Sequence, residues 1–137
     1  PVIKYSKKDE TFIRKYVYSD EESVAAITGR TIEEQHKIAC ACENNLYIFT
    51  NGNNEIIGSV VLREKDDTLD VVELFIKNEL RRSENGSKFL DEIEKMAADE
   101  GFARITIPEG DNWHTHTFCY RRGYTKSAVQ GEMEKIL

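Results

Sequence analysis

Three β-rich runs follow one another in the middle of the chain, and they limit the fold more than any other feature of the sequence. The runs LYIFT, IIGSVVLRE and LDVVELFIK begin at Leu46, Ile56 and Leu69. Asn51-Gly52 stands between the first two runs and is a strong short-range signal for a β-hairpin. The third run is mostly apolar, so we expect it in the centre of a sheet, where both faces are covered.

An amphipathic helix is predicted after these runs, and two more are predicted before them. Phe89, Leu90 and Ile93 open an apolar stripe that continues to Ala97, and Gly101 ends the pattern as a residue just past a helix should. Before the strands, a helix is predicted over residues 31–45, because Thr31 followed by Glu34 is the capping-box pattern of a helix start.

The first of the helices is predicted from an apolar pattern near the start of the chain. Phe12, Ile13, Tyr16 and Val17 fall at helical spacing, and the pattern breaks at the acidic residues 20–22. These acidic residues are therefore expected in the connection between the first two helices.

The remaining segments complete an α/β pattern. Strands are predicted at residues 2–6, 103–108, 124–129 and 132–137, and a short helix capped by Asp111 or Asn112 before Gly123. The order β-α-α-β-β-β-α-β-α-β-β predicts a mixed, mostly antiparallel central sheet of about six or seven strands flanked by helices. With 137 residues, the chain is long enough for a single domain over residues 1–137.

Composition and charge exclude several classes of protein. The net charge of −6 argues against a nucleic-acid-binding module. No apolar run approaches the length of a membrane span, and the start lacks a signal-peptide pattern, so we expect a cytoplasmic protein that lost its initiator Met before Pro1. Cys40, Cys42 and Cys119 are an odd number of cysteines, which favours reduced thiols over disulfides.

The loop before the last long helix has the composition of an anion site. Arg81, Arg82 and Lys88 surround Asn85-Gly86-Ser87, directly before the helical pattern. The first N–H groups of a helix have no partner within the helix, and a Gly lets the backbone approach an anion closely. A solvated loop with an ordinary helix start fits this stretch equally well.

Read with the strand before it, the segment LFIKNELRRSENGSKFL resembles the acyl-CoA-binding motif of the GNAT superfamily of N-acetyltransferases. In that motif a Pro-Glu step and the pattern Q/R-x-x-G-x-G/A open a helix. Arg81 takes the Q/R place and Gly86 the second Gly. Asn78-Glu79 stands where Pro-Glu is usual, and Glu84 replaces the first Gly.

A second motif of the same family has a counterpart near the end of the chain. The family pattern N-x-x-A-x-x-F-Y-x-x-x-G-F is matched at Asn112, Phe118 and Gly123. Cys119 occupies the Tyr position of the pattern, and Tyr120 stands one place later. The two motifs together extend the resemblance over residues 46–137.

The resemblance implies an acyl-CoA N-acyltransferase fold and direct transfer of an acetyl group from acetyl-CoA to a primary amine, without a metal. It places pantetheine on the backbone of residues 74–76 and the pyrophosphate over the loop. The cofactor residues that it implies are Leu74, Phe75, Ile76, Arg81, Arg82, Glu84, Asn85, Gly86, Ser87, Lys88, Asn112 and Tyr120.

The resemblance also implies catalytic roles. Glu73 would be the base that removes a proton from the amine, although a strand carboxylate facing solvent or paired with an Arg fits it too. Tyr120 is the first choice for the acid that protonates the CoA thiolate. Cys119 is the residue in register, but a small buried hydrophobe is its simpler interpretation.

The acceptor would be a small molecule or a peptide with an amine. The acidic residues 20–22 fall where family members contact the acceptor and suggest a cationic one, or else they form a solvated loop. Many family members are homodimers, so the resemblance suggests a homodimer here too. A zinc site is not expected, because Cys-x-Cys and His-x-His on helices put their side chains about 200° apart. Two other functions stay open, a sensor that binds acyl-CoA without catalysis and an interaction domain unrelated to CoA.

Overall fold

The computed structural model describes residues 7–42, 45–80, 86–109 and 119–137. Seven strands form one sheet in the order β1-β2-β3-β4-β5-β7-β6. The strands are β1 (Phe12–Lys15), β2 (Leu46–Thr50), β3 (Ile56–Lys65), β4 (Thr68–Ile76), β5 (Arg104–Pro108), β6 (Thr125–Lys126) and β7 (Glu132–Ile136). The helices are α1 (Glu21–Thr28), α2 (Ile32–Ala41) and α3 (Gly86–Asp99). Neighbouring strands are antiparallel except β4 and β5, which are parallel.

This architecture confirms the predicted α/β class and the mixed, mostly antiparallel sheet. The β2–β3 hairpin forms around the predicted turn, and β4 is the fourth of the seven strands in the sheet, as its apolar sequence predicts. Thr31 caps α2 as expected, because its side chain accepts a hydrogen bond from the Glu34 N–H while the Glu34 carboxylate accepts one from the Thr31 N–H.

The helix predicted over residues 12–17 is wrong. Phe12–Lys15 form strand β1, and all four of these residues pair with β2. The helix α1 starts later, at Glu21. Pairing with a strand more than thirty residues away satisfies the backbone there, and no local pattern reports such a partner. The strand predicted at residues 2–6 and most of the predicted helix at 111–123 lie outside the described residues.

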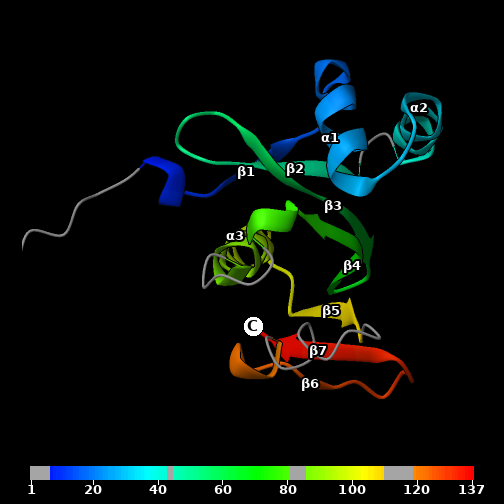
Figure 1. The fold of residues 1–137 in the computed structure, drawn as a ribbon. Helices are drawn as coiled ribbons and strands as arrows, with labels where there is room; N and C mark the ends of the chain where they lie inside the picture. Colours follow the sequence, from blue (N-terminus) through cyan, green and yellow to red (C-terminus); the bar gives the residue numbers. More distant parts are fainter. Residues whose placement is uncertain (1–6, 43–44, 81–85, 110–118) are drawn as a thin grey trace, which may run out of the picture.

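The helices cover opposite faces of the sheet. Figure 1 shows α1 and α2 together on one side of β1–β3 and α3 on the other. The face under α3 carries the main core, in which Phe49 meets Phe89 edge to face at 4.7 Å between ring centroids. On the opposite face, the fully buried Val24 of α1 packs toward β3 and β4.

A β-bulge divides β4 into two halves. Val61 pairs with Glu73 and Leu62 pairs with Val71, so Val72 is one extra residue on β4. Before the bulge, Leu69 and Val71 belong to the core under α3; after it, Leu74 and Ile76 pack against that core. The side chains of Glu73 and Phe75 therefore lie on the face of α1 and α2.

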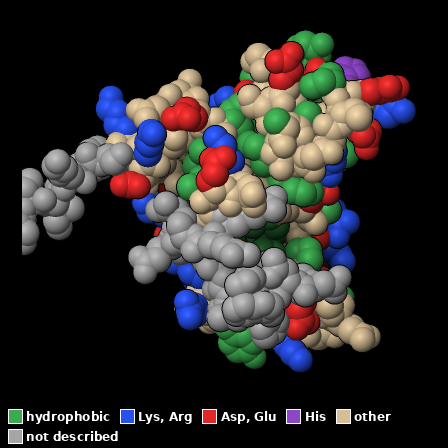
Figure 2. Space-filling model, viewed as in Figure 1, with side chains coloured by type: hydrophobic (Ala, Val, Ile, Leu, Met, Phe, Trp, Pro, Cys, Tyr) green, Lys and Arg blue, Asp and Glu red, His purple; other side chains and the backbone are tan. Residues whose placement is uncertain are grey.

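Charges of both signs are mixed on the surface. Figure 2 shows Lys and Arg side chains interspersed with Asp and Glu around the visible face. In the described part of the chain, no helix is long and apolar enough to cross a membrane.

Candidate active site

The second half of β4 offers backbone groups on one edge. Within the described residues, β5 pairs with β4 at Thr68–Asp70 and not beyond. The Lys77 N–H bonds the carbonyl of Ile57 on β3, so the odd-numbered residues just before it bond toward β3. The backbone groups of Leu74 and Ile76 point the other way, toward the side where β5 has diverged. The backbone groups of Leu74 are ones that an extended ligand can pair with, as an added strand would.

Glu73, the proposed base, is held by an arginine. Nη2 of Arg30 lies 2.6 Å from Oε1 of Glu73, and the guanidinium stands 5.1 Å from the centroid of the Phe75 ring. The Arg30 side chain is 18% exposed and that of Glu73 is 36% exposed. The other carboxylate oxygen of Glu73, Oε2, has no hydrogen bond or ion pair within the described part of the chain.

The two candidate acids lie in different surroundings. Cys119 is buried in the core under α3, and burial, with a smaller contribution from the Glu94 charge, raises the pKa of its thiol to about 11. Tyr120 follows it and is 51% exposed. The buried thiol fits a packing role, whereas the exposed phenol is accessible to a substrate.

The proposed pyrophosphate loop is described in part. Gly86 is the first residue of α3, so the predicted helix N-terminus is where the motif puts it. Ser87 follows in the first turn, and the Lys88 ammonium donates a hydrogen bond to the backbone carbonyl of Asp9. The other predicted contacts lie outside the described residues, namely Arg81, Arg82, Glu84, Asn85 and Asn112.

The acidic residues 20–22 do not form the connection that the sequence suggested. Asp20 is buried directly before α1, where its carboxylate accepts two hydrogen bonds of 2.9 Å from Arg14 and one from the Val17 N–H. Burial opposes ionisation of Asp20, but these bonds outweigh it and lower its pKa. Glu21 Oε1 lies 3.2 Å from His36 Nδ1. Of the three carboxylates, that of Asp20 is engaged in hydrogen bonds within the protein, whereas Glu21 Oε1 is buried without a hydrogen-bond partner among the described residues.

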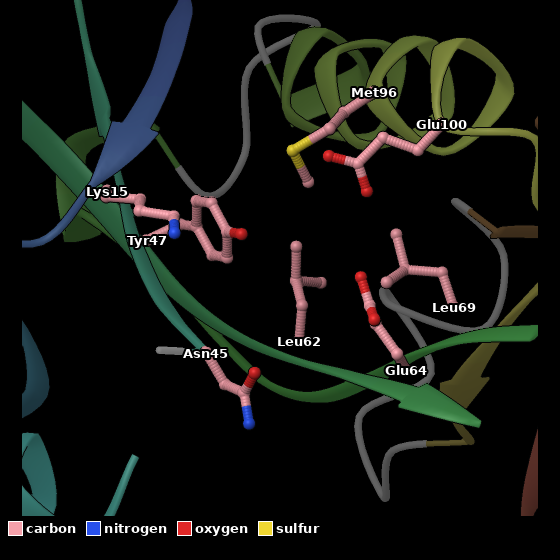
Figure 3. A pocket seen from close by; sticks show the side chains of 8 residues that line it. All are labelled: Lys15, Asn45, Tyr47, Leu62, Glu64, Leu69, Met96 and Glu100. Carbon is pink, nitrogen blue, oxygen red and sulfur yellow. The ribbon is translucent and has the colours of Figure 1, made fainter. Parts of the chain in front are cut away.

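A cavity of about 310 Å³ lies away from Glu73, on the face of α3. Figure 3 shows Tyr47, Glu64 and Glu100 turned toward the same space, with Leu62 between them. Burial, together with the charges of Glu100 and Glu64, raises the pKa of the Tyr47 phenol. β4 contributes Leu69, from the half that precedes the bulge, so this cavity is distinct from the open edge of β4.

Arg30 is the site residue that sequence reasoning missed. It lies between two predicted helices, 43 residues from Glu73, and no motif marks it. The sequence did allow for an Arg partner of Glu73, but it could not say which of the arginines would reach it. Metal-binding clusters of three or more His, Cys, Asp or Glu are not found among the described residues.

Comparisons with known proteins identify the fold and the family. The acetyltransferase (GNAT) family model matches residues 6–124. The structure of the PaiA N-acetyltransferase from Thermoplasma acidophilum in complex with coenzyme A is similar, with a TM-score of 0.72 at 18% identity over 93% of this chain and 99% of that one.

Two further solved structures share the fold. A ribosomal-protein-alanine N-acetyltransferase from Brucella melitensis has a TM-score of 0.70 at 13% identity, over 92% of this chain and 99% of that one. The IAA acetyltransferase from Bacillus cereus has a TM-score of 0.69 at 13% identity, over 93% and 100%. A search among curated proteins finds no significant match. Because the family model covers most of its length, the chain belongs to the GNAT family of acetyl-CoA-dependent N-acetyltransferases.

Proposed function

We propose that this enzyme moves the acetyl group of acetyl-CoA directly to a primary amine beside Glu73. The observation that carries the proposal is the edge of β4 after the bulge, where Leu74 turns its backbone groups away from β3. This edge supports a pantetheine arm bound as an extra strand. Glu73 lies between Leu74 and the bulge, on the face of α1 and α2.

The pyrophosphate is assigned to the N-terminus of α3. Gly86 begins the helix, whose first N–H groups and macrodipole favour an anion. We assign Arg81, Arg82 and Lys88 to charge-assisted contacts with the phosphates. Because Lys88 bonds the Asp9 carbonyl, this contact has to be exchanged when the phosphates bind.

The chemistry divides into two proton removals from the nitrogen and one proton delivery to the sulfur. Glu73 takes a proton from the ammonium of the acceptor, directly or through a water, and the neutral nitrogen attacks the thioester carbonyl. The C–N bond forms, the C–S bond breaks, and Tyr120 donates a proton to the departing thiolate, while the nitrogen loses its second proton to solvent water. Cys119 is the weaker choice for this donor, because burial raises the pKa of its thiol to about 11.

Calorimetry with acetyl-CoA, combined with a free-thiol assay over a panel of amines, tests the function. We expect binding and amine-dependent release of CoA. Tyr120→Phe should lower kcat more than acetyl-CoA affinity, whereas Cys119→Ser should retain most of the turnover. An acetyl group found on Cys119 by mass spectrometry would reverse the two assignments.

The loop assignment has its own test. Replacing Arg81 and Arg82 together by Ala should weaken acetyl-CoA binding, most of all at low salt. Glu84→Gly should tighten binding by roughly threefold to tenfold, because a carboxylate near the phosphates repels them and screening by solvent keeps this repulsion small. Unchanged affinity in the double Arg variant would place the phosphates elsewhere.

A sensor that binds acyl-CoA without catalysis is the second candidate. The ion pair between Arg30 and Glu73 favours it, since the guanidinium already occupies one oxygen of the proposed base. Acetyl-CoA binding without thiol release for any amine would support the sensor. Asp20, which is engaged by Arg14, lends no support to a cationic acceptor. A homodimer and a cytoplasmic location stay predictions.

A further inference from the structure

Arg30 is fixed in place by the ends of two helices. Gly29 ends α1 with φ of 75°, the left-handed conformation that Gly adopts without strain. The Arg30 N–H bonds the carbonyl of Ala25 on α1, and Thr31 caps α2 directly afterwards. The backbone of Arg30 therefore has little freedom, and its side chain is aimed across β4.

The Arg30 side chain is oriented by two contacts with β4. Nη2 bonds Glu73 at 2.6 Å, and the guanidinium lies over the face of Phe75 at 5.1 Å. A guanidinium carries five N–H donors in a planar fork. In the described part of the chain, the N–H groups on Nη1 and Nε make no hydrogen bond. The Arg30 side chain is 18% exposed to solvent, so a ligand can reach it.

A positive and a negative group thus stand side by side where the acceptor amine must arrive. This pair is complementary to a molecule that carries an ammonium and a carboxylate a few bonds apart. The carboxylate can occupy the remaining donors of Arg30, and the ammonium can approach the second oxygen of Glu73. A polycation would instead bring a second positive charge against Arg30, at an energetic cost.

We propose that the acceptor is a free amino acid or a similar small zwitterion, with its carboxylate on Arg30 and its amino group beside Glu73. This inference rests on the proposed acetyl transfer and adds the class of acceptor. Glu73 removes one proton from the ammonium, and the nitrogen then attacks the thioester carbon. A peptide N-terminus has no carboxylate next to its amine and would leave the Arg30 donors unused.

The test compares free amino acids with the corresponding amino acid amides, whose carboxylate is replaced by a neutral carboxamide. The carboxamide lowers the pKa of the neighbouring amine and provides more neutral nucleophile, so a preference for the free acid has to come from binding. We expect kcat/KM to favour the best free acid over its amide by roughly tenfold or more. Equal or better use of the amide would overturn the inference and leave the acetyl transfer standing.

Substitutions of Arg30 assign the preference to its side chain. Arg30→Gln should lower the ratio of kcat/KM for the free acid to that for the amide by roughly tenfold to a hundredfold. Arg30→Lys should give an intermediate preference, because an ammonium restores the charge without the fork. A preference that survives in both variants would remove Arg30 from recognition.

Arg63→Gln is the matched control, because Arg63 pairs with Asp70 on β4 at 2.5 Å, in the half that precedes the bulge. It should leave the ratio of acid to amide unchanged. Thermal unfolding of each variant checks the fold, and the comparison in the parent enzyme decides the question even if a variant does not fold. Acetyl-CoA binding with no amino acid accepted would overturn the inference, whereas absence of acetyl-CoA binding would overturn the proposed function itself.

Discussion

Replacing Gly58 with Ala should destabilise the protein and disturb the open edge of β4. A Cβ built on Gly58 would lie 2.8 Å from the backbone oxygen of Phe75, 3.2 Å from the Phe89 ring and 3.3 Å from the Phe49 ring. The first distance is shorter than real Cβ contacts, and it involves backbone rather than a flexible side chain. The added methyl must therefore push β4 or the β3 backbone itself.

The expected magnitude follows from two opposing effects. A Gly-to-Ala change stabilises a protein by about 0.4–1 kcal/mol when the fold tolerates it, because the unfolded chain loses freedom. An extra methyl in a packed core costs about 1–3 kcal/mol. Because the contact with the Phe75 oxygen cannot be relieved by a rotamer change, we expect a net loss of about 1–2 kcal/mol. For a chain of 137 residues this corresponds to a fall in Tm of roughly 3–8 °C.

Urea unfolding of the parent and the Gly58→Ala variant measures this loss, and calorimetry with acetyl-CoA measures the effect on the site. We expect affinity to fall about threefold or more, because Phe75 directly follows Leu74, whose backbone groups we assign to pantetheine. Ser59→Ala on the same strand, which adds no Cβ, is the control and should change both quantities less. An unfolding free energy within about 0.5 kcal/mol of the parent would refute the packing argument.

Three further outcomes are expected. Glu94→Gln should lower the free energy of unfolding, measured with urea, by about 1–3 kcal/mol. The Glu94 side chain is 12% exposed and its carboxylate lies 2.7 Å from Arg122 and 2.6 Å from Lys135. An unchanged urea midpoint of unfolding would contradict this. Burial raises the pKa of the Cys119 thiol to about 11, so the folded state holds this proton more tightly than the unfolded state. The unfolding free energy of the parent should therefore fall, relative to that of Cys119→Ala, as the pH rises from about 9 to 11. Equal pH dependence of the two unfolding free energies would refute this. Gly29→Ala should cost about 1–2 kcal/mol in urea unfolding, because φ is 75° there, and Asn should recover part of the loss.

Local patterns predicted the elements whose causes are local. The capping box at Thr31, the turn at Asn51-Gly52 and the apolar stripe of α3 each depend on residues a few positions apart, and all three are found in the structure. The segment at Phe12 shows the opposite case. Its spacing fits a helix, yet it forms an edge strand, because β2 is present to pair with it.

The candidate site was predictable to a similar extent. The resemblance gave the strand, the loop and the helix start, since these follow one another in the sequence. The ion pair between Arg30 and Glu73 depends on how the connection between α1 and α2 lies over β4, which no local pattern specifies. The burial of Cys119 likewise depends on its packing in the core beneath α3.

The extra residue at Val72 changes the parity of β4. Counting from Leu69, every second residue would be Val71, Glu73 and Phe75, and an uninterrupted strand would turn the Glu73 carboxylate into the apolar interior. The bulge shifts this count by one, so that one strand supplies odd positions to the interior before the bulge and even positions after it. A deletion of Val72 would remove the bulge and leave the inner and outer residues as they are, whereas one residue added to β3 opposite Val72 would pair the strands without a bulge and exchange the inner and outer residues of the second half of β4. With that insertion in β3, the enzyme would lose its proposed base and acceptor site without any change to the chemical identity of Glu73 or Arg30.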